Sequence, residues 1–160
     1  MGRFYAEGTT VAVEKSKTEI EALLKCYKAD QFMSGWDSDG RAFVMFRLSQ
    51  RYVKFLLRIP PITDPHFLKV PSSRRAARRD QRERELWRSL LLVIKAKLES
   101  VEAGIETVEE AFLAQTVLPD GSTVGAWAAK ALPAAYETAQ MPKSLLALPP
   151  APEPTGDDHR

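Results

Sequence analysis

The chain has 160 residues, of which 44% are hydrophobic and 28% are charged, and a formal net charge of +2. These values are typical of a globular protein with one domain and a substantial core. The apolar runs Leu90–Ile94 and Ser144–Pro150 are too short to cross a bilayer. The single cysteine, Cys26, excludes an intramolecular disulfide. The N-terminus lacks a secretory signal pattern, so we expect a cytoplasmic protein that does not enter a membrane.

The first part of the chain predicts a strand followed by a helix. A β-prone stretch lies within residues 4–13. Ser16 and Glu19 have the spacing of a capping box, in which each side chain satisfies a backbone amide at the start of a helix. Apolar residues follow at helical spacing, so we expect a short amphipathic helix over residues 17–28.

The next segment predicts a three-stranded β-meander. Its expected strands are Phe32–Asp37, Arg41–Leu48 and Tyr52–Ile59, and residues 38–40 and 49–51 form the turns between them. A proline pair ends the last strand, because proline cannot donate to a ladder.

Helices dominate the second half. Residues 60–73 read as a loop, and a long helix is expected from about residue 75 to residue 103, with Gly104 just after its end. Thr107 and Glu110 form another capping box, which predicts a short helix ending near residue 115.

These elements predict an α+β fold. A small antiparallel β-meander with an N-terminal helix is followed by a long helix with a basic tip and two shorter C-terminal helices. The last helix covers residues 123–139, after a turn at residues 118–121, and Pro133 lies inside it. We expect a single domain over residues 1–141 and a proline-rich, disordered tail over residues 142–160.

An apolar stripe runs along the long helix with a repeat of 3.5 residues. It comprises Trp87, Leu91, Ile94, Leu98 and Val101. The spacing has two interpretations, namely a core helix packed on the sheet or a seam that joins two copies in a homodimer. So short a repeat seldom sustains a coiled coil alone, which favours the core helix.

Charge is segregated along the chain. Residues 41–98 carry 15 Lys/Arg against 4 Asp/Glu, whereas residues 99–160 carry 3 against 10. The basic block is centred on Arg74, Arg75, Arg78, Arg79 and Arg82. Asp80 and Glu83 lie four residues from Arg84 and Arg79, so part of this charge is paired within the helix. Such a concentrated positive field indicates a polyanion or an acidic protein surface as the partner.

Alternation along the meander predicts two different faces. One face is the expected core and holds Ala42, Val44, Phe46, Leu48, Val53, Phe55, Leu57 and Ile59. The opposite face mixes aromatic and cationic side chains, namely Phe43, Arg47, Tyr52, Lys54 and Arg58. Single-strand-binding proteins use this combination to stack bases and to neutralise phosphates. The alternative is that a helix covers this face and the cations reach past it to solvent.

The sequence offers no catalytic, cofactor or metal site. Asp37 begins a segment that resembles a calcium loop, but Leu48 stands where a bidentate glutamate is required. The only histidines are His66 and His159, too few for a histidine-based metal cluster. We therefore expect a protein that is not an enzyme.

Two stretches resemble small uncharacterised proteins encoded in phage and prophage genomes. The first stretch comprises Arg3–Thr9 and continues through Trp36. The second extends from Trp87 through the turn Leu118–Gly121 to Trp127. The resemblance covers about residues 3–145 and implies a phage accessory protein in a bacterial host cytoplasm, but no activity is established for that family.

These observations lead to one functional expectation and one alternative. The first is a non-catalytic nucleic-acid-binding protein of phage type. Its arginine-rich helix would contact phosphates, and its sheet face would contact bases or sugars. The alternative is a protein-interaction module, an inhibitor or adaptor, that docks the same arginines on an acidic host protein. Exposure of Phe43, Tyr52 and Lys54 would favour nucleic acid.

Overall fold

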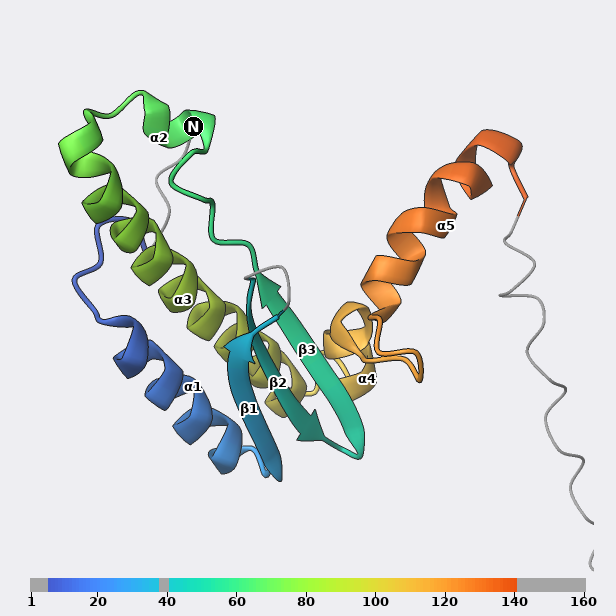
Figure 1. Ribbon diagram of the computed structural model, residues 1–160. Helices are drawn as coiled ribbons and strands as arrows, with labels where there is room; N and C mark the ends of the chain where they lie inside the picture. The colour runs from blue at the N-terminus through green and yellow to red at the C-terminus, as the bar shows by residue number, and fades with distance from the viewer. Residues whose placement is uncertain (1–5, 38–40, 141–160) are drawn as a thin grey trace, which may run out of the picture. The chain divides into compact units, whose positions relative to one another are not determined.

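The computed structural model describes residues 6–37 and 41–140. The chain divides into two compact units, residues 1–125 and residues 126–160. The first unit holds the described strands and most of the helices, whereas α5, Val124–Thr138, lies almost entirely in the second unit. The expected α+β fold is confirmed (Figure 1).

The three strands form one antiparallel sheet in the order β1-β2-β3, as the meander predicts. Their bounds are Gln31–Trp36, Ala42–Leu48 and Arg51–Leu57. Ser49 and Gln50 connect β2 to β3, and both have positive φ, 48° and 63°. This matches a two-residue type I′ turn, the geometry that suits the twist of a hairpin. The other predicted turn, at residues 38–40, lies outside the described residues.

The N-terminal predictions are wrong in two respects. Residues 9–12 form no strand, and helix α1 spans Val13–Cys26, with Ala12 as its N-cap. Ser16 is therefore not a capping residue but lies inside the helix and is fully buried. Ser16, Ile20 and Leu24 form the buried face of α1, and burying that face extends the helix beyond the predicted start.

The predicted loop between the sheet and the long helix contains a short helix, α2, Pro65–Leu68. Asp64 caps it, its side chain accepting from the His66 amide at 2.8 Å, and Phe67 is buried. The long helix, α3, spans Ser72–Glu102 and so begins three residues earlier than predicted. Gly104 follows its end with φ 71°, as the glycine signal predicts.

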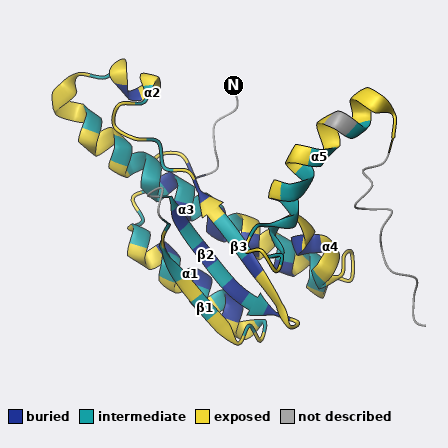
Figure 2. Ribbon diagram, turned by 45° about the vertical axis from the view of Figure 1, so that its right-hand side comes forward, coloured by how far each residue is buried: buried dark blue, intermediate teal, exposed yellow. Residues whose placement is uncertain are grey.

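The core lies between the inner face of the sheet and the helices α1, α3 and α4, where α4 spans Val108–Phe112 (Figure 2). The strand residues predicted to face the core are buried or packed against it. The apolar stripe of α3 joins them: Trp87, Leu91, Ile94 and Leu98 are buried, and Val101 is half-buried against the cluster. The stripe thus packs within the chain's own core, the first of its two interpretations.

The predicted capping box of α4 is confirmed, with Thr107 and Glu110 bonded reciprocally. A 3-10 helix, η1, follows at Leu113–Gln115. The chain then runs beside the edge of β3 that faces away from β2. There the amide of Val117 donates to the carbonyl of Tyr52 at 2.8 Å. Pro133 lies inside α5. None of the described helices combines the length and apolarity that a membrane crossing requires.

Candidate nucleic-acid interface

The first turns of α3, residues 72–82, are here called the arginine arm. This part of α3 extends beyond the sheet and beside α2 (Figure 1). Most of its side chains are exposed up to Arg78, whereas the buried residues of α3 begin only at Glu85. The arm therefore belongs to the long helix but does not contribute to the core.

Three arginines of the arm form no ion pair with a described residue. Arg74 and Arg78 are exposed, and neither forms an ion pair or a hydrogen bond with a described residue. The Arg75 guanidinium donates to the carbonyls of Val70, at 2.9 Å, and Leu68, at 3.4 Å. Carbonyls are neutral acceptors, so Arg75 is held in place while its charge remains available to an anion.

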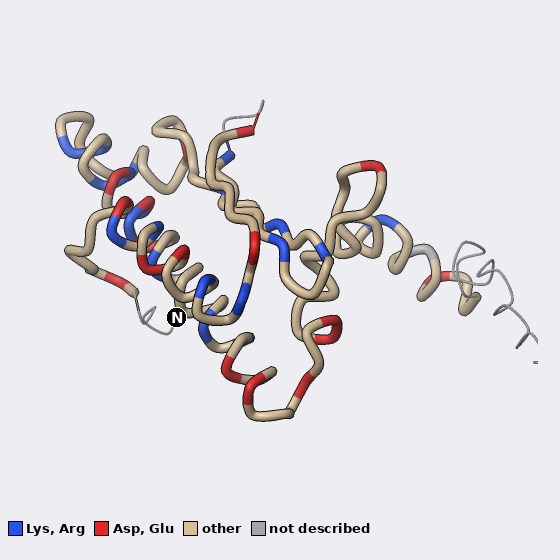
Figure 3. The backbone as a smooth tube through the Cα atoms, turned by 90° about the horizontal axis from the view of Figure 1, so that it is seen from below, with Lys and Arg blue, Asp and Glu red and all other residues tan. Residues whose placement is uncertain are grey.

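The other two arginines of the arm lie close to carboxylates. Arg79 is 3.7 Å from Glu83, the predicted spacing of four residues, and 3.9 Å from Asp80. Arg82 is 3.4 Å from Glu85. Arg84, in contrast to the prediction, donates to the side chain of Gln81 rather than pairing with Asp80. Figure 3 shows this interleaving of basic and acidic positions along α3.

Glu85 is a buried carboxylate that no pattern in the sequence singles out. It is 4% exposed and accepts hydrogen bonds from the Gly8 amide, at 3.1 Å, and from Gln81 and Arg82, each at 3.4 Å. Burial raises the pKa of its carboxyl, but these hydrogen bonds and the charge of Arg78 outweigh it and lower the pKa below its ordinary value. Glu85 thus fixes the N-terminal segment to α3 at the base of the arm.

The second part of the interface is the outer face of the sheet, opposite the core. The β2–β3 register sets Phe43 opposite Leu56, Met45 opposite Lys54 and Arg47 opposite Tyr52. Strand β1 adds Gln31, Met33 and Gly35 to the same face. The absence of a side chain at Gly35 accommodates the Phe43 ring, since a Cβ there would approach the ring to 3.2 Å.

Two cations of the outer face, Arg47 and Lys54, each contact a neighbouring side chain. The Nε and Nη2 groups of Arg47 donate to the two oxygens of the Asp30 carboxylate. That hydrogen bond lowers the pKa of Asp30 and raises that of Arg47. The Lys54 ammonium lies 5.5 Å from the centroid of the Phe43 ring, a cation–π distance.

Aromatic and apolar side chains occupy much of the remaining outer face. Met33 is 52% exposed, and Tyr52 and Leu56 are each 40% exposed. The Tyr52 hydroxyl donates to the Gln31 side chain at 2.8 Å. Within the first unit, α1, α3 and α4 pack on the inner side of the sheet (Figures 1 and 2). Of the two alternatives from the sequence, a covering helix is therefore not found among the described elements of this unit.

The structure gathers Phe43, Arg47, Tyr52 and Lys54 on one face, but it places the arginine arm in the helical layer on the other side of the sheet. Arg58 is exposed just after β3. This strand ends on the same side of the unit as α2 and the arm (Figure 1). Arg58 therefore lies between the two predicted contact regions, which are the outer face of the sheet and the arginine arm.

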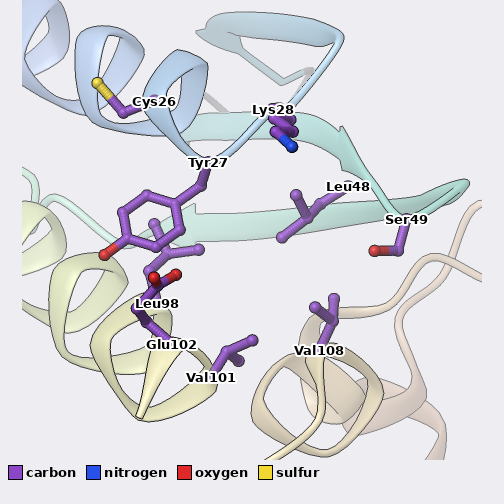
Figure 4. A pocket seen from close by; sticks show the side chains of 9 residues that line it. All are labelled: Cys26, Tyr27, Lys28, Leu48, Ser49, Leu98, Val101, Glu102 and Val108. Carbon is purple, nitrogen blue, oxygen red and sulfur yellow. The ribbon is translucent and has the colours of Figure 1, made fainter. Parts of the chain in front are cut away.

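A cleft of about 540 Å³ lies away from the arm, between the ends of α1 and α3 and the β2–β3 turn (Figure 4). Its aliphatic side chains are Leu48, Leu98, Val101 and Val108, and Tyr27, Lys28 and Glu102 add polar groups. Burial, followed by the nearby charges of Glu99, Glu102 and Cys26, raises the pKa of Tyr27. In Figure 4 the Cys26 thiol points away from the space between Tyr27 and Val108.

Within residues 6–37 and 41–140, no group of three or more His, Cys, Asp or Glu side chains is placed to hold a metal ion. No protein-family model, curated protein or solved structure matches the chain. The resemblance to phage-encoded proteins therefore stays a prediction.

Proposed function

We propose that this protein binds nucleic acid without catalysis, as an accessory protein of phage type. The arginine arm contacts phosphates through Arg74, Arg75 and Arg78, and Arg79 and Arg82 extend the positive surface. The observation that carries the proposal is the state of the first three arginines. Their charges protrude from the core on a rigid helix, and none of the three is paired with a carboxylate among the described residues.

The chemistry of arginine supports a phosphate as the partner. A guanidinium presents a planar fork of donors that matches two oxygens of a phosphate. The hydrogen bonds of Arg75 to Val70 and Leu68 use Nε and one Nη2 proton, and they hold the guanidinium and its remaining N–H donors in position before a ligand arrives. This preorganisation lowers the entropy that binding must remove.

The outer face of the sheet supports a second contact, with unpaired bases. Tyr52 and Phe43 offer rings, and the exposed Met33 and Leu56 extend the apolar surface around them. Base stacking on such rings tolerates any sequence and requires a single strand. Arg58, exposed at the end of β3, would contact the backbone between the face and the arm. The proposal thus includes a preference for single strands.

The arm is tested by reversing its free charges. Fluorescence anisotropy with labelled single-stranded and duplex oligonucleotides should show that Arg74→Glu with Arg78→Glu abolishes binding to both. The matched control is Lys25→Glu with Lys95→Glu, which changes the net charge equally at exposed sites outside the arm. Unaltered affinity in the arm variant, or equal losses in both variants, would refute phosphate contact by the arm.

A separate variant tests base stacking on the outer face of the sheet. Tyr52→Ala should lower the affinity for single strands about tenfold, since one stacked base contributes about 1–3 kcal/mol. Duplex affinity should be unchanged. Tyr136→Ala is the control, because it removes a tyrosine that is 84% exposed in the other unit. If the wild-type protein binds no nucleic acid at low salt but binds acidic host proteins through the arm, the interaction-module alternative replaces the proposal.

A further inference from the structure

Strand β1 has an unpaired edge. The amide of Asp37 donates to the carbonyl of Arg41 at 2.9 Å, so Asp37 bonds toward β2. In an antiparallel ladder the bonding direction alternates from one residue to the next. The residues whose N–H and C=O point away from β2 are therefore Phe32, Ser34 and Trp36. None of the three has another hydrogen bond with any part of the chain that the structure describes.

The two edges of the sheet differ in whether a described segment of the chain bonds to them. Residues Thr116 and Val117 run beside β3 and bond to it, so that edge is partly covered. The edge of β1 carries no such segment among the described residues. Exposed edges are commonly protected by lysine, proline or a bulge. The sequence of β1, Gln-Phe-Met-Ser-Gly-Trp, contains neither a charge nor a proline.

The acidic residues that flank β1 do not protect it either. Asp30 precedes the strand and is bonded to Arg47, and Asp37 follows it and is bonded to Arg41, with Nε and Oδ2 2.7 Å apart. Both arginines lie on the β2 side of β1. The carboxylates are thus drawn away from the open edge and compensated, so they would not repel a second strand.

Helix α1 leaves space along this edge. A cavity of about 170 Å³ lies between the second half of α1 and the start of β1, where Phe32 lines it. Another, of about 330 Å³, lies between the first turns of α1, the first half of α3 and Trp36. Trp36 is 55% exposed, although it ends a strand on the core side of the sheet.

We propose that β1 pairs antiparallel with β1 of a second copy, which joins two three-stranded sheets into one continuous sheet. The two-fold axis would pass through the sheet at Ser34. Such an axis keeps the core face on the same side, so each residue lies opposite one of the same face. Ser34 then faces Ser34, and Phe32 faces Trp36 of the second copy.

This register uses the outward-facing backbone groups of Phe32, Ser34 and Trp36 in both copies. The three outward-facing residues of each strand make about six backbone hydrogen bonds in all. The alternative register, centred on Met33, would leave Trp36 opposite Asp30 and would make fewer bonds. The Ser34-centred register also forms two cross-strand Phe–Trp pairs, which stabilise antiparallel strands. It is therefore the better of the two pairings.

The interface is independent of the nucleic-acid proposal and differs from the stripe of α3. Sedimentation equilibrium of the full chain should show a monomer–dimer equilibrium in the micromolar range. Ser34→Pro should give a monomer, because proline removes an N–H that points away from β2 and its ring blocks a second strand. Ser34→Thr should retain the dimer. A wild-type monomer at every concentration, or a dimer that Ser34→Pro leaves intact, would overturn the proposal.

A cysteine at the axis tests the register without relying on proline. In the Cys26→Ser background, Ser34→Cys should form a disulfide-linked dimer on mild oxidation. Paired residues at this position have Cα atoms about 5.5 Å apart, within reach of a disulfide. Ser73→Cys, exposed on the arginine arm, should not cross-link at a comparable rate. Equal rates at both sites would contradict pairing at Ser34.

Discussion

Two buried polar side chains, Glu85 and Ser16, are expected to affect the stability of the folded state in opposite directions. The Glu85 carboxylate has three donors, whereas the Ser16 hydroxyl and the Trp87 indole N–H are buried and have no hydrogen-bond partner among the described residues. A buried polar group stabilises a fold only when its hydrogen bonds are made. Glu85 is therefore expected to stabilise the folded state, and Ser16 to destabilise it.

Glu85→Gln should lower the free energy of unfolding by about 1–2 kcal/mol at neutral pH, because it removes the charge that three donors stabilise. The pKa of Glu85 is lowered by folding, so its contribution is present above the ordinary pKa of 4.5 and is lost as the pH falls through the lower folded pKa. Urea titrations at a series of pH values should therefore show the two proteins converging in acid. Glu99→Gln, at an exposed site, should have little effect, and a constant difference down to acid pH would contradict this account.

Ser16→Ala should raise the melting temperature. The change removes a buried hydroxyl that bonds to no residue within 6–37 and 41–140, and it improves helix propensity, a gain of up to about 1 kcal/mol. Thr107→Ala is the informative comparison, since Thr107 caps α4 and its loss should destabilise by about 1 kcal/mol. Thermal unfolding followed by circular dichroism measures both, and a lower melting temperature for Ser16→Ala would show that the hydroxyl is bonded.

At the scale of elements, local signals in the sequence predicted most of the fold. Alternation in β2 and β3, the glycine after α3 and the capping box at Thr107 each report on their own segment, and each prediction is confirmed. The start of α1 was wrong because Ser16 and Glu19 imitate a cap, while packing of the buried face decides where that helix begins. Helix α2 was missed because its single turn lies among prolines and shows no periodicity.

The β2–β3 turn offers a prediction at this scale. Ser49 and Gln50 occupy the positive φ region, which side chains other than asparagine and glycine adopt at a cost. Ser49→Asn with Gln50→Gly should therefore stabilise the hairpin by about 1 kcal/mol. Chemical denaturation should show a higher midpoint with an unchanged slope. A lower midpoint would mean that these side chains make contacts that outweigh the strain.

At the scale of the whole molecule, charge segregation follows the fold. The basic block covers β2, β3, α2 and most of α3, and acidic residues gather around the junction of α3 and α4 (Figure 3), namely Glu99, Glu102, Glu106, Glu109 and Glu110. The sequence predicted which arginines gather on one helix, since neighbours in a helix share its exposed end. It could not predict which of them stay free, because the partners of Arg75 and Arg82 depend on side-chain geometry.

The sequence also predicted part of the outer face of the sheet. Strand alternation placed Phe43, Tyr52 and Lys54 on one face, as the register confirms. The pairing of Arg47 with Asp30 was missed, because the two residues are distant in sequence and meet only when β1 aligns with β2. This pairing offsets the positive charge of Arg47 and makes the face less cationic than the sequence suggested, and so makes stacking its expected contribution to binding.

The salt dependence of binding to a single-stranded oligonucleotide tests the central claim most directly. Contact of the arm with about three to five phosphates should give a slope of log K against log salt of about −2 to −4 for a single strand. Anisotropy titrations across a range of salt concentrations would measure it. Absence of binding at low salt, or an affinity that does not change with salt, would contradict phosphate recognition by the arginine arm.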